Sequence, residues 1–231
     1  MDIEILSLSS GAKQAKGTAV IIDVFRAFTL EAYLFAQGAE TIYAIGSEEK
    51  ARTMKKEHPA YILIGERAGK KLPGFDYGNS PSAVRTKDFS GRSFVHTTTN
   101  GTQGIKNAVH ADRILTGSFV NAKATASYIR SLHPKDVSLV AMGWEDRCTE
   151  EDELCALYLK SLLEEKPLRD LKEQLNALRY SEGKKFFDPA QQEAFPQADF
   201  AMCTAADQFD FAIEAEKKDD MAVCCKRRVH A

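Results

Sequence analysis

Short, continuous apolar runs alternate with amphipathic stretches from residue 18 onward, and this alternation constrains the fold more than any other feature. TAVIIDV at residues 18–24 is typical of a strand buried on both faces, and residues 26–37 after it have the pattern of a helix. Further strands are predicted at residues 41–45, 61–66, 93–98, 113–118 and 137–143, and helices at 47–57, 80–85, 102–109, 121–132 and 149–164. The alternation predicts an α/β fold, with three α/β/α layers around a mostly parallel sheet that has a mixed edge.

The pattern changes after Pro167. A helix is predicted at residues 168–178, a connection rich in Gly and Lys at 181–187, and a short helix at 189–195. Residues 210–216 and 221–228 predict a hairpin joined by the charged turn KKDD, and residues 3–6 predict one more strand at a sheet edge. Because no repeat or linker interrupts the chain, we predict a single domain over residues 1–231, with its motifs at about 18–165 and a C-terminal extension at about 166–231.

The composition excludes several classes of protein. The formal net charge is -2, so no basic field is available for nucleic acid or an anionic membrane. MDIEILSL has no signal-peptide pattern, and no apolar stretch approaches the roughly 20 residues that span a bilayer. The five cysteines lack C-x-x-C pairs, which favours reduced thiols in a cytoplasmic protein, with Cys155 and Cys203 packed in the core. We therefore expect any anion to be bound locally, with neither nucleic acid nor membrane as a partner.

Polar side chains gather where the predicted strands end, and ligands of parallel α/β sheets bind beyond those carboxyl ends. Asp23 ends the first strand, and Arg26 follows it; the alternative is that Asp23 caps the next helix or pairs with Arg26. Glu66 and Arg67 end the third strand, and a surface salt bridge is the alternative there. Asn79 follows in a loop whose glycines indicate a shaped turn.

The run HTTTNGT at residues 96–102 leads from a β-branched strand into a helix. A helix N-terminus offers unpaired N–H groups, and hydroxyls beside it add donors, so this run suits a phosphate. A Thr-rich strand with a capped turn is the alternative. Residues 117–121 repeat the strand, turn and helix arrangement, with Ser118 and Asn121 near the same edge.

Five acids lie between residues 145 and 152, at the start of the next predicted helix. A capping box of Thr149 and Asp152 explains one of them. Because carboxylates and phosphate repel each other unless a metal bridges them, the acids together with the phosphate site predict a Mg²⁺ ion.

At these same segments the chain resembles the 2-phosphosulfolactate phosphatase family. The matching stretches are AVIIDVFRAFT, GERAGKKLPGFDYGNSP, TTTNGT, LTGSFVNA and GWEDRCTEEDELCA, in the family's order. The resemblance implies a Mg²⁺-dependent α/β/α phosphatase that releases phosphate from a small anionic substrate, 2-phospho-3-sulfolactate or a related phosphorylated 2-hydroxy acid. It assigns the metal to Asp23, Glu66 and one or both of Glu151 and Asp152. It implies catalytic roles for Asp23, Arg26, Arg67 and Asn100. It implies substrate or phosphate contacts for Arg26, Arg67, Asn79, Thr98, Thr99, Asn100, Gly101, Thr102, Ser118 and Asn121.

The chain departs from the family pattern at Phe28, at His96 and in the bulky, charged loop 144–147. In the mechanism we expect, Mg²⁺ and arginines neutralise the phosphoryl oxygens. The nucleophile is a metal-oriented water or Asp23; water is favoured because the second Asp of the aspartyl-phosphate pattern is missing. A second cationic pocket is expected at Arg67 or at Lys70 and Lys71.

Two expectations concern partners. A non-catalytic sensor of a phosphorylated metabolite is the alternative function, and it would bind without turnover. A homodimer is possible, with the C-terminal strand at its interface.

Overall fold

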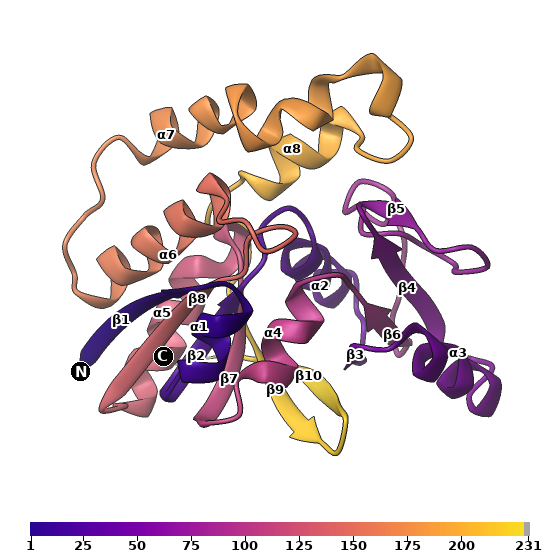
Figure 1. The fold of residues 1–231 in the computed structure, drawn as a ribbon, viewed down its shortest axis with the longest axis horizontal. Helices are drawn as coiled ribbons and strands as arrows, with labels where there is room; N and C mark the ends of the chain where they lie inside the picture. Colours follow the sequence, from indigo (N-terminus) through magenta and orange to yellow (C-terminus); the bar gives the residue numbers. More distant parts are fainter. Residues whose placement is uncertain (229–231) are drawn as a thin grey trace.

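The computed structural model describes residues 1–228 and confirms the α/β class. One mixed sheet of ten strands lies between layers of helices (Figure 1). The strands, in their order across the sheet, are β1 (Asp2–Ser7), β8 (Asp136–Ala141), β2 (Gly17–Ile22), β7 (Ala111–Gly117), β9 (Ala212–Lys218), β10 (Met221–Arg227), β3 (Thr41–Ile45), β6 (Ser93–Thr97), β4 (Ile62–Arg67) and β5 (Lys70–Lys71).

Helices cover both faces of the sheet because the central strands are apolar on both sides. On β2, Ala19 and Ile21 pack in one core cluster, and Val20 and Ile22 in the other. The first cluster includes residues of α1 (Leu8–Gln14), α2 (Ala27–Ala36) and α4 (Gly101–Asn107). The second includes residues of α5 (Ala122–Leu132), α6 (Glu150–Leu163), α7 (Leu171–Ala177) and α8 (Gln197–Cys203). A third, smaller cluster packs α3 (Glu48–Glu57) against β3, β4 and β6.

The C-terminal hairpin lies at the centre of the sheet. β9 pairs antiparallel with β7, and β10 pairs antiparallel with β3. The hairpin therefore joins two parallel blocks, one of β1, β8, β2 and β7 and the other of β3, β6 and β4. Both edges of β10 are paired within the chain, so this strand is not available to pair with a strand of a second copy, and the homodimer stays a prediction.

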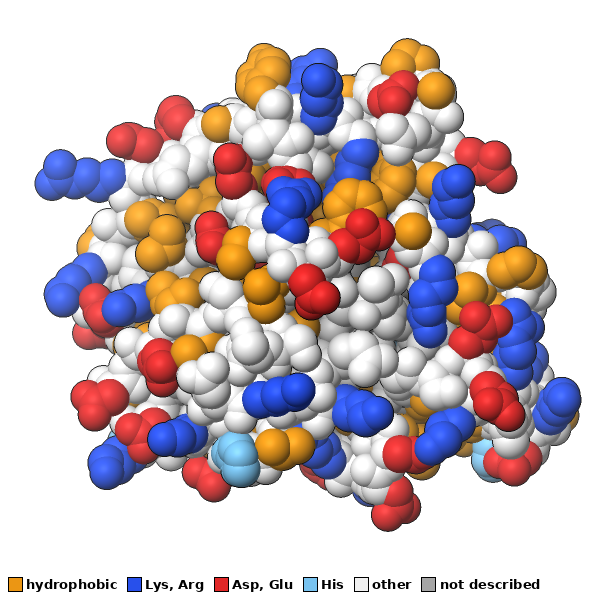
Figure 2. Space-filling model, viewed as in Figure 1, with side chains coloured by type: hydrophobic (Ala, Val, Ile, Leu, Met, Phe, Trp, Pro, Cys, Tyr) orange, Lys and Arg blue, Asp and Glu red, His pale blue; other side chains and the backbone are white. Residues whose placement is uncertain are grey.

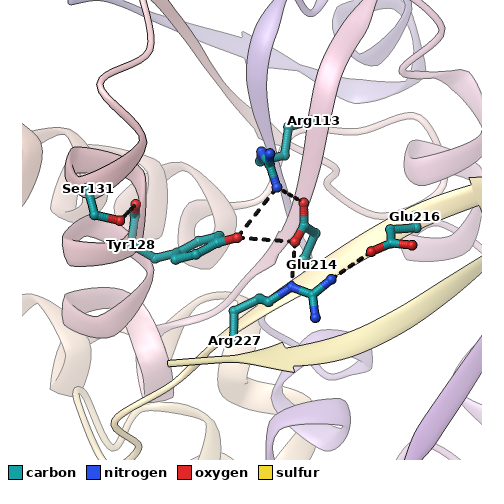
Figure 3. Close-up of polar contacts among 6 residues, drawn as sticks. All are labelled: Arg113, Tyr128, Ser131, Glu214, Glu216 and Arg227. Carbon is teal, nitrogen blue, oxygen red and sulfur yellow. Dashed lines mark hydrogen bonds and ion pairs between the residues drawn. The ribbon is translucent and has the colours of Figure 1, made fainter. Parts of the chain in front are cut away.

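A set of polar contacts fixes the hairpin to its neighbours (Figure 3). The carboxylate of Glu214 is 5% exposed, and it accepts hydrogen bonds from Arg227 Nε at 2.6 Å, from Tyr128 Oη at 3.1 Å and from Arg113. These partners come from β10, α5 and β7, so one buried acid links three elements around β9.

The predicted elements agree with the structure best where the apolar pattern is strongest. The strands at 41–45 and 93–98, the hairpin and the edge strand β1 are confirmed. Residues 80–85 do not form the predicted helix. They form turns, in which the N–H groups of Ala83 and Val84 reach back three residues, because Asp199 takes the Ser80 hydroxyl and the Ser82 N–H instead.

The remaining differences are in short helices. The expected connection at 181–187 contains the 3₁₀ helix η3 (Glu182–Phe187), and the expected helix at 189–195 is only η4 (Pro189–Gln191). Two more 3₁₀ turns are η1 (Phe119–Asn121) and η2 (Leu178–Tyr180). Helices α1 and α8 were not predicted, since seven residues give little periodicity to detect.

Cys155 and Cys203 are both fully buried in the core, as expected. Within residues 1–228, no helix combines the length and the apolar character that a membrane crossing requires. On the face seen in Figure 2, Lys and Arg side chains are interspersed with Asp and Glu, and no extended patch of one sign is visible among the residues drawn in colour.

Candidate active-site cleft

A cleft lies beyond the carboxyl ends of β2, β4, β6 and β8, at the junction of the two parallel blocks. The segment between α7 and α8, orange in Figure 1, contributes Lys185 and Phe195 to it. The full lining is Asp23, Phe25, Arg26, Glu66, Gly69, Asn79, Thr99, Asn100, Gly143, Trp144, Glu151, Asp152, Lys185 and Phe195. The cleft therefore lies where the strand-end rule predicts a ligand site.

Asp23 follows β2 and has one oxygen engaged by the backbone. Its Oδ1 accepts the Ala27 N–H at 3.1 Å, so the capping alternative holds for this oxygen. Its Oδ2 lies against Gly101, where a Cβ would come within 2.9 Å. Burial raises the pKa of Asp23 to about 6, the Ala27 hydrogen bond lowers it, and the charge of Glu66 raises it further. The charge of His96 and a backbone contact of Gly101 also lower the pKa of Asp23, but burial is the largest cause.

Arg26 lines the cleft, and its charge is paired with Asp199, a residue of the C-terminal extension. Its Nη1 donates to Asp199 Oδ2 at 2.7 Å, and its Nη2 donates to the Gly69 carbonyl at 3.0 Å. Its guanidinium also lies over the ring of Phe195, at 4.8 Å from the centroid. The alternative pairing of Arg26 with Asp23 is not formed, and Asp199 is a site residue that sequence reasoning missed.

Glu66 holds two loops together. Its Oε1 accepts the Thr99 N–H and its Oε2 accepts the Gly69 N–H, both at 2.7 Å. Arg67 is not part of the cleft lining; it donates to the Glu66 carbonyl at 2.6 Å and to Thr97 Oγ1 at 3.2 Å. The surface salt bridge between Glu66 and Arg67 is likewise absent from the ion pairs of residues 1–228.

The run at residues 98–102 divides into two parts. Thr98 and Thr102 are buried and bond each other, with the Thr102 N–H donating to Thr98 Oγ1 at 3.1 Å, so the capped-turn alternative explains both. Thr99 and Asn100 line the cleft, and Asn100 donates from Nδ2 to the Gly143 carbonyl at 2.7 Å. Gly101 is outside the lining but provides the room that Asp23 needs.

Ser118 and Asn121 do not reach the cleft. Both are buried, with 0% and 1% of their surface exposed, and Ser118 Oγ donates to Asn121 Oδ1 at 3.3 Å. Asn121 in turn donates to the Phe211 carbonyl at 3.4 Å, just before β9. The second strand, turn and helix arrangement therefore fixes the entry to the hairpin, and the prediction that it contacts the phosphate is not supported by this geometry.

Two of the five acids near the start of α6 reach the cleft. Asp152 accepts the Val24 N–H at 2.8 Å and the Gly143 N–H at 2.9 Å, which ties the loop after β2 to the loop after β8. Glu151 has a buried Oε2 without a hydrogen-bond partner. Burial raises the pKa of Glu151 to about 7, and burial followed by the charge of Glu151 raises that of Asp152 well above its usual range.

Lys185 is a cation of the cleft that sequence reasoning missed. Its Nζ lies 4.4 Å from the ring centroid of Trp144 and 5.4 Å from that of Phe195. Burial lowers its pKa, and the charge of Glu151 raises it. None of the residues expected to form a cationic pocket, Arg67, Lys70 and Lys71, lines this cleft, and both lysines are exposed. Lys71 lines an adjoining hollow together with Arg26 and Asn79. The only feature of the sequence that could have indicated Lys185 is the KKFF run at residues 184–187, and no sequence pattern places this run near the strand ends.

His96 occupies a buried polar contact that accounts for its departure from the family pattern. Its Nδ1 lies 2.9 Å from Glu31 Oε1, and its Nε2 lies 3.1 Å from Asn79 Oδ1. Both ring nitrogens thus face side-chain oxygens. Because the oxygen of Asn79 faces His96, its amide nitrogen is left for the cleft that Asn79 lines.

The donor set of the cleft fits a hard cation held by few protein ligands. No three acidic, His or Cys side chains of residues 1–228 lie close enough together to hold a metal ion by themselves. Glu151 Oε2 is nevertheless a buried oxygen without a hydrogen-bond partner, and Asp23, whose Oδ2 lies against Gly101, lines the same cleft. Mg²⁺ commonly takes one or two carboxylates and completes its shell with waters and phosphate oxygens, which matches this set.

Comparison with known proteins agrees with the geometry. Residues 5–229 match the family model described as 2-phosphosulpholactate phosphatase. The chain belongs to the 2-phosphosulfolactate phosphatase family. Because the match extends to residue 229, the extension that carries Lys185 and Asp199 is part of the family's domain.

Individual relatives carry the family's name. A "Probable 2-phosphosulfolactate phosphatase" of Carboxydothermus hydrogenoformans is 40% identical over 75% of this chain and 72% of its own length. The protein of the same description from Bacillus subtilis is 30% identical over 87% of this chain and 88% of its own length. One from Caldicellulosiruptor saccharolyticus is 41% identical over 62% of this chain and 61% of its own length.

Proposed function

We propose that this protein is a Mg²⁺-dependent phosphatase that hydrolyses 2-phospho-3-sulfolactate, or a related phosphorylated 2-hydroxy acid, to the free acid and phosphate. The observation that carries the proposal is the pairing of charges in one cleft. Two buried carboxylates, on Asp23 and Glu151, share the cleft with two cations, on Arg26 and Lys185, and Glu151 Oε2 has no hydrogen-bond partner. This combination suits phosphate transfer, since the cations attract the anion and the carboxylates can share a metal with it.

Asp23 and Glu151 would hold the Mg²⁺ ion, which neutralises charge on the phosphoryl oxygens when bound. The raised pKa values of both groups support this assignment, because burial is the largest cause of each shift and a bound cation would stabilise the charged carboxylates that burial disfavours. Asp152 and Glu66 act differently. Each accepts two backbone N–H groups, and they thereby fix the loops on which the other site residues lie.

The remaining cleft residues bind and orient the substrate. Arg26 offers the guanidinium N–H groups that Asp199 and Gly69 do not use, and Asn79 offers its amide nitrogen. The transition state of phosphoryl transfer is loose, with charge spread over the oxygens, so positioning and electrostatics supply most of the rate enhancement. A water molecule is the proposed nucleophile, because Asp23 has one oxygen bound to the Ala27 N–H and the other assigned to the metal.

The test is phosphate release from the purified, chelator-treated protein with a panel of phosphorylated 2-hydroxy acids, with and without Mg²⁺. Asp23→Asn and Glu151→Gln should each abolish Mg²⁺-dependent release. Glu153→Gln is the matched control, because Glu153 is an exposed acid in the first turn of the same helix and should leave activity unchanged. If no substrate releases phosphate while calorimetry still detects binding, the phosphatase proposal fails and the protein is a sensor.

A further inference from the structure

Asn79 lines the cleft with a side chain that a single contact orients. Among the hydrogen bonds of residues 1–228, the Asn79 side chain has one partner, His96, with 3.1 Å between Oδ1 and Nε2. The loop on either side is held separately. The Tyr77 carbonyl accepts a backbone N–H of β4 at 3.1 Å, and the Ser80 hydroxyl donates to Asp199 at 2.9 Å. Loss of the His96 contact would therefore free the Asn79 side chain to rotate without releasing its loop.

His96 is itself held by a buried acid. Glu31, in α2, places Oε1 2.9 Å from His96 Nδ1, and both side chains are 0% exposed. In the sheet, His96 pairs with Ala44 of β3 and Ile64 of β4, which are apolar and buried. Which nitrogen of a histidine carries the proton depends on the partner of the other nitrogen, so Glu31 acts on the contact that His96 makes with Asn79.

Stability alone does not explain the pair of Glu31 and His96. The second carboxylate oxygen, Glu31 Oε2, is buried without a hydrogen-bond partner, which costs free energy. Apolar side chains of similar volume often replace a buried pair of this kind without loss of stability. The contacts of the pair lead instead to Asn79, and through it to the cleft.

We propose that Glu31 and His96 are positioning residues, which hold the Asn79 side chain in the orientation that binds the substrate; this inference rests on the proposed function. Neither of the two is among the residues that line the cleft. Because Asn79 Oδ1 is engaged by His96, the amide nitrogen is directed to the substrate side. A donor that is already oriented does not lose rotational freedom when the substrate binds, and this raises kcat/KM.

Two substitutions of His96 separate its two contacts. Glutamine places an amide nitrogen near the position of Nε2, and asparagine places one near that of Nδ1, so only glutamine keeps a donor for Asn79. With 2-phospho-3-sulfolactate and Mg²⁺, His96→Asn should lower kcat/KM about tenfold, the loss of one oriented hydrogen bond. His96→Gln should lower it less than about threefold. Equal losses in the two variants would overturn the proposal.

A double-mutant cycle tests whether the effect passes through Asn79. The variant with both Glu31→Met and His96→Leu fills the site with apolar side chains. It should match the wild-type protein in urea unfolding, yet lose about tenfold in kcat/KM. Once Asn79 is replaced by alanine, neither this double substitution nor His96→Asn should lower kcat/KM by more than about twofold. A further tenfold loss in that background would refute the proposal.

The orientation of Asn79 can also be measured without turnover. Crystal structures of the wild-type protein and His96→Gln should show the Asn79 side chain in one orientation, and His96→Asn should show it rotated or spread over several. If this result is obtained while no substrate is hydrolysed, the positioning by His96 stands and the phosphatase function fails. If Asn79 keeps its wild-type orientation in His96→Asn, the positioning is refuted whether or not the protein is a phosphatase.

Discussion

Replacing Asp199 by alanine removes the carboxylate that connects the C-terminal extension to the cleft. Asp199 Oδ2 accepts from Arg26 at 2.7 Å, and Oδ1 accepts from the Ser80 hydroxyl and from the Ser82 N–H, each at 2.9 Å. The side chains of Arg26 and Asp199 are 2% and 0% exposed, so water cannot take over the ion pair. We expect Asp199→Ala to lower both stability and activity.

The magnitude follows from these contacts. Removing one partner of a buried ion pair costs about 3–5 kcal/mol, because the other charge stays buried without compensation. The Ser80 and Ser82 donors are only partly buried, so water can satisfy them and they add little. We therefore expect the free energy of unfolding to fall by about 4 kcal/mol. Ser80→Ala keeps the ion pair and should cost about 1 kcal/mol.

Urea unfolding of the wild-type protein and both variants measures the stability effect. Phosphate release from the sulfonated substrate measures the effect on the cleft, under conditions in which each variant is more than 90% folded by the same unfolding curve (about 1.4 kcal/mol of stability). We expect a higher KM for Asp199→Ala, since Arg26 is no longer held toward the phosphate. A loss of less than about 1 kcal/mol, with KM unchanged, would refute the reasoning that this buried pair positions Arg26.

Two other predictions concern the hairpin and the buried acids. Glu214→Ala should lower the free energy of unfolding by about 1–3 kcal/mol. This loss is smaller than the loss of a fully buried ion pair, because the side chains of its partners Arg113 and Arg227 are 37% and 34% exposed. Urea unfolding measures the loss, which should be smaller for the control Glu216→Ala, since the Glu216 side chain is 51% exposed. The pKa values of Asp23 and Glu151, raised to about 6 and about 7, predict that the metal-free protein loses stability as pH rises from about 4 to about 7, since the folded state retains protons that the unfolded state releases. Mg²⁺ should then raise the unfolding temperature more at pH 8 than at pH 5, and an equal rise at both would show that these groups do not bind it.

The strand ends could be located from sequence because they depend on local patterns. TAVII is apolar without interruption, so the polar Asp23 after it marks the end of β2 and the edge at which ligands bind. The acids at the start of α6 were found in the same way. What each acid does was not predictable. Glu66 and Asp152 resemble metal ligands in sequence, but in the structure they accept backbone N–H groups from loops that are distant along the chain.

The contribution of the C-terminal extension was missed because no local pattern encodes it. Arg26 and Asp199 are 173 positions apart, and neither has a neighbour in sequence that indicates the other. Lys185 lies in a 3₁₀ helix of six residues, too short to show a face by its periodicity. Its approach to Trp144 depends on the ion pair of Arg147 with Glu182, which joins two segments whose charges look like ordinary surface charges in the sequence.

The order of the strands explains why the shape of the cleft depends on the hairpin of β9 and β10. Asp23 and Glu151 belong to the block of β1, β8, β2 and β7, whereas Glu66 and Asn79 belong with the block of β3, β6 and β4. In the sheet, these two blocks are joined only by β9 and β10. A cleft whose walls come from both blocks can take its final shape only when the hairpin is in place, and the hairpin is held by Glu214. The hairpin of β9 and β10 therefore sets the distance between the carboxylates and the groups that face them.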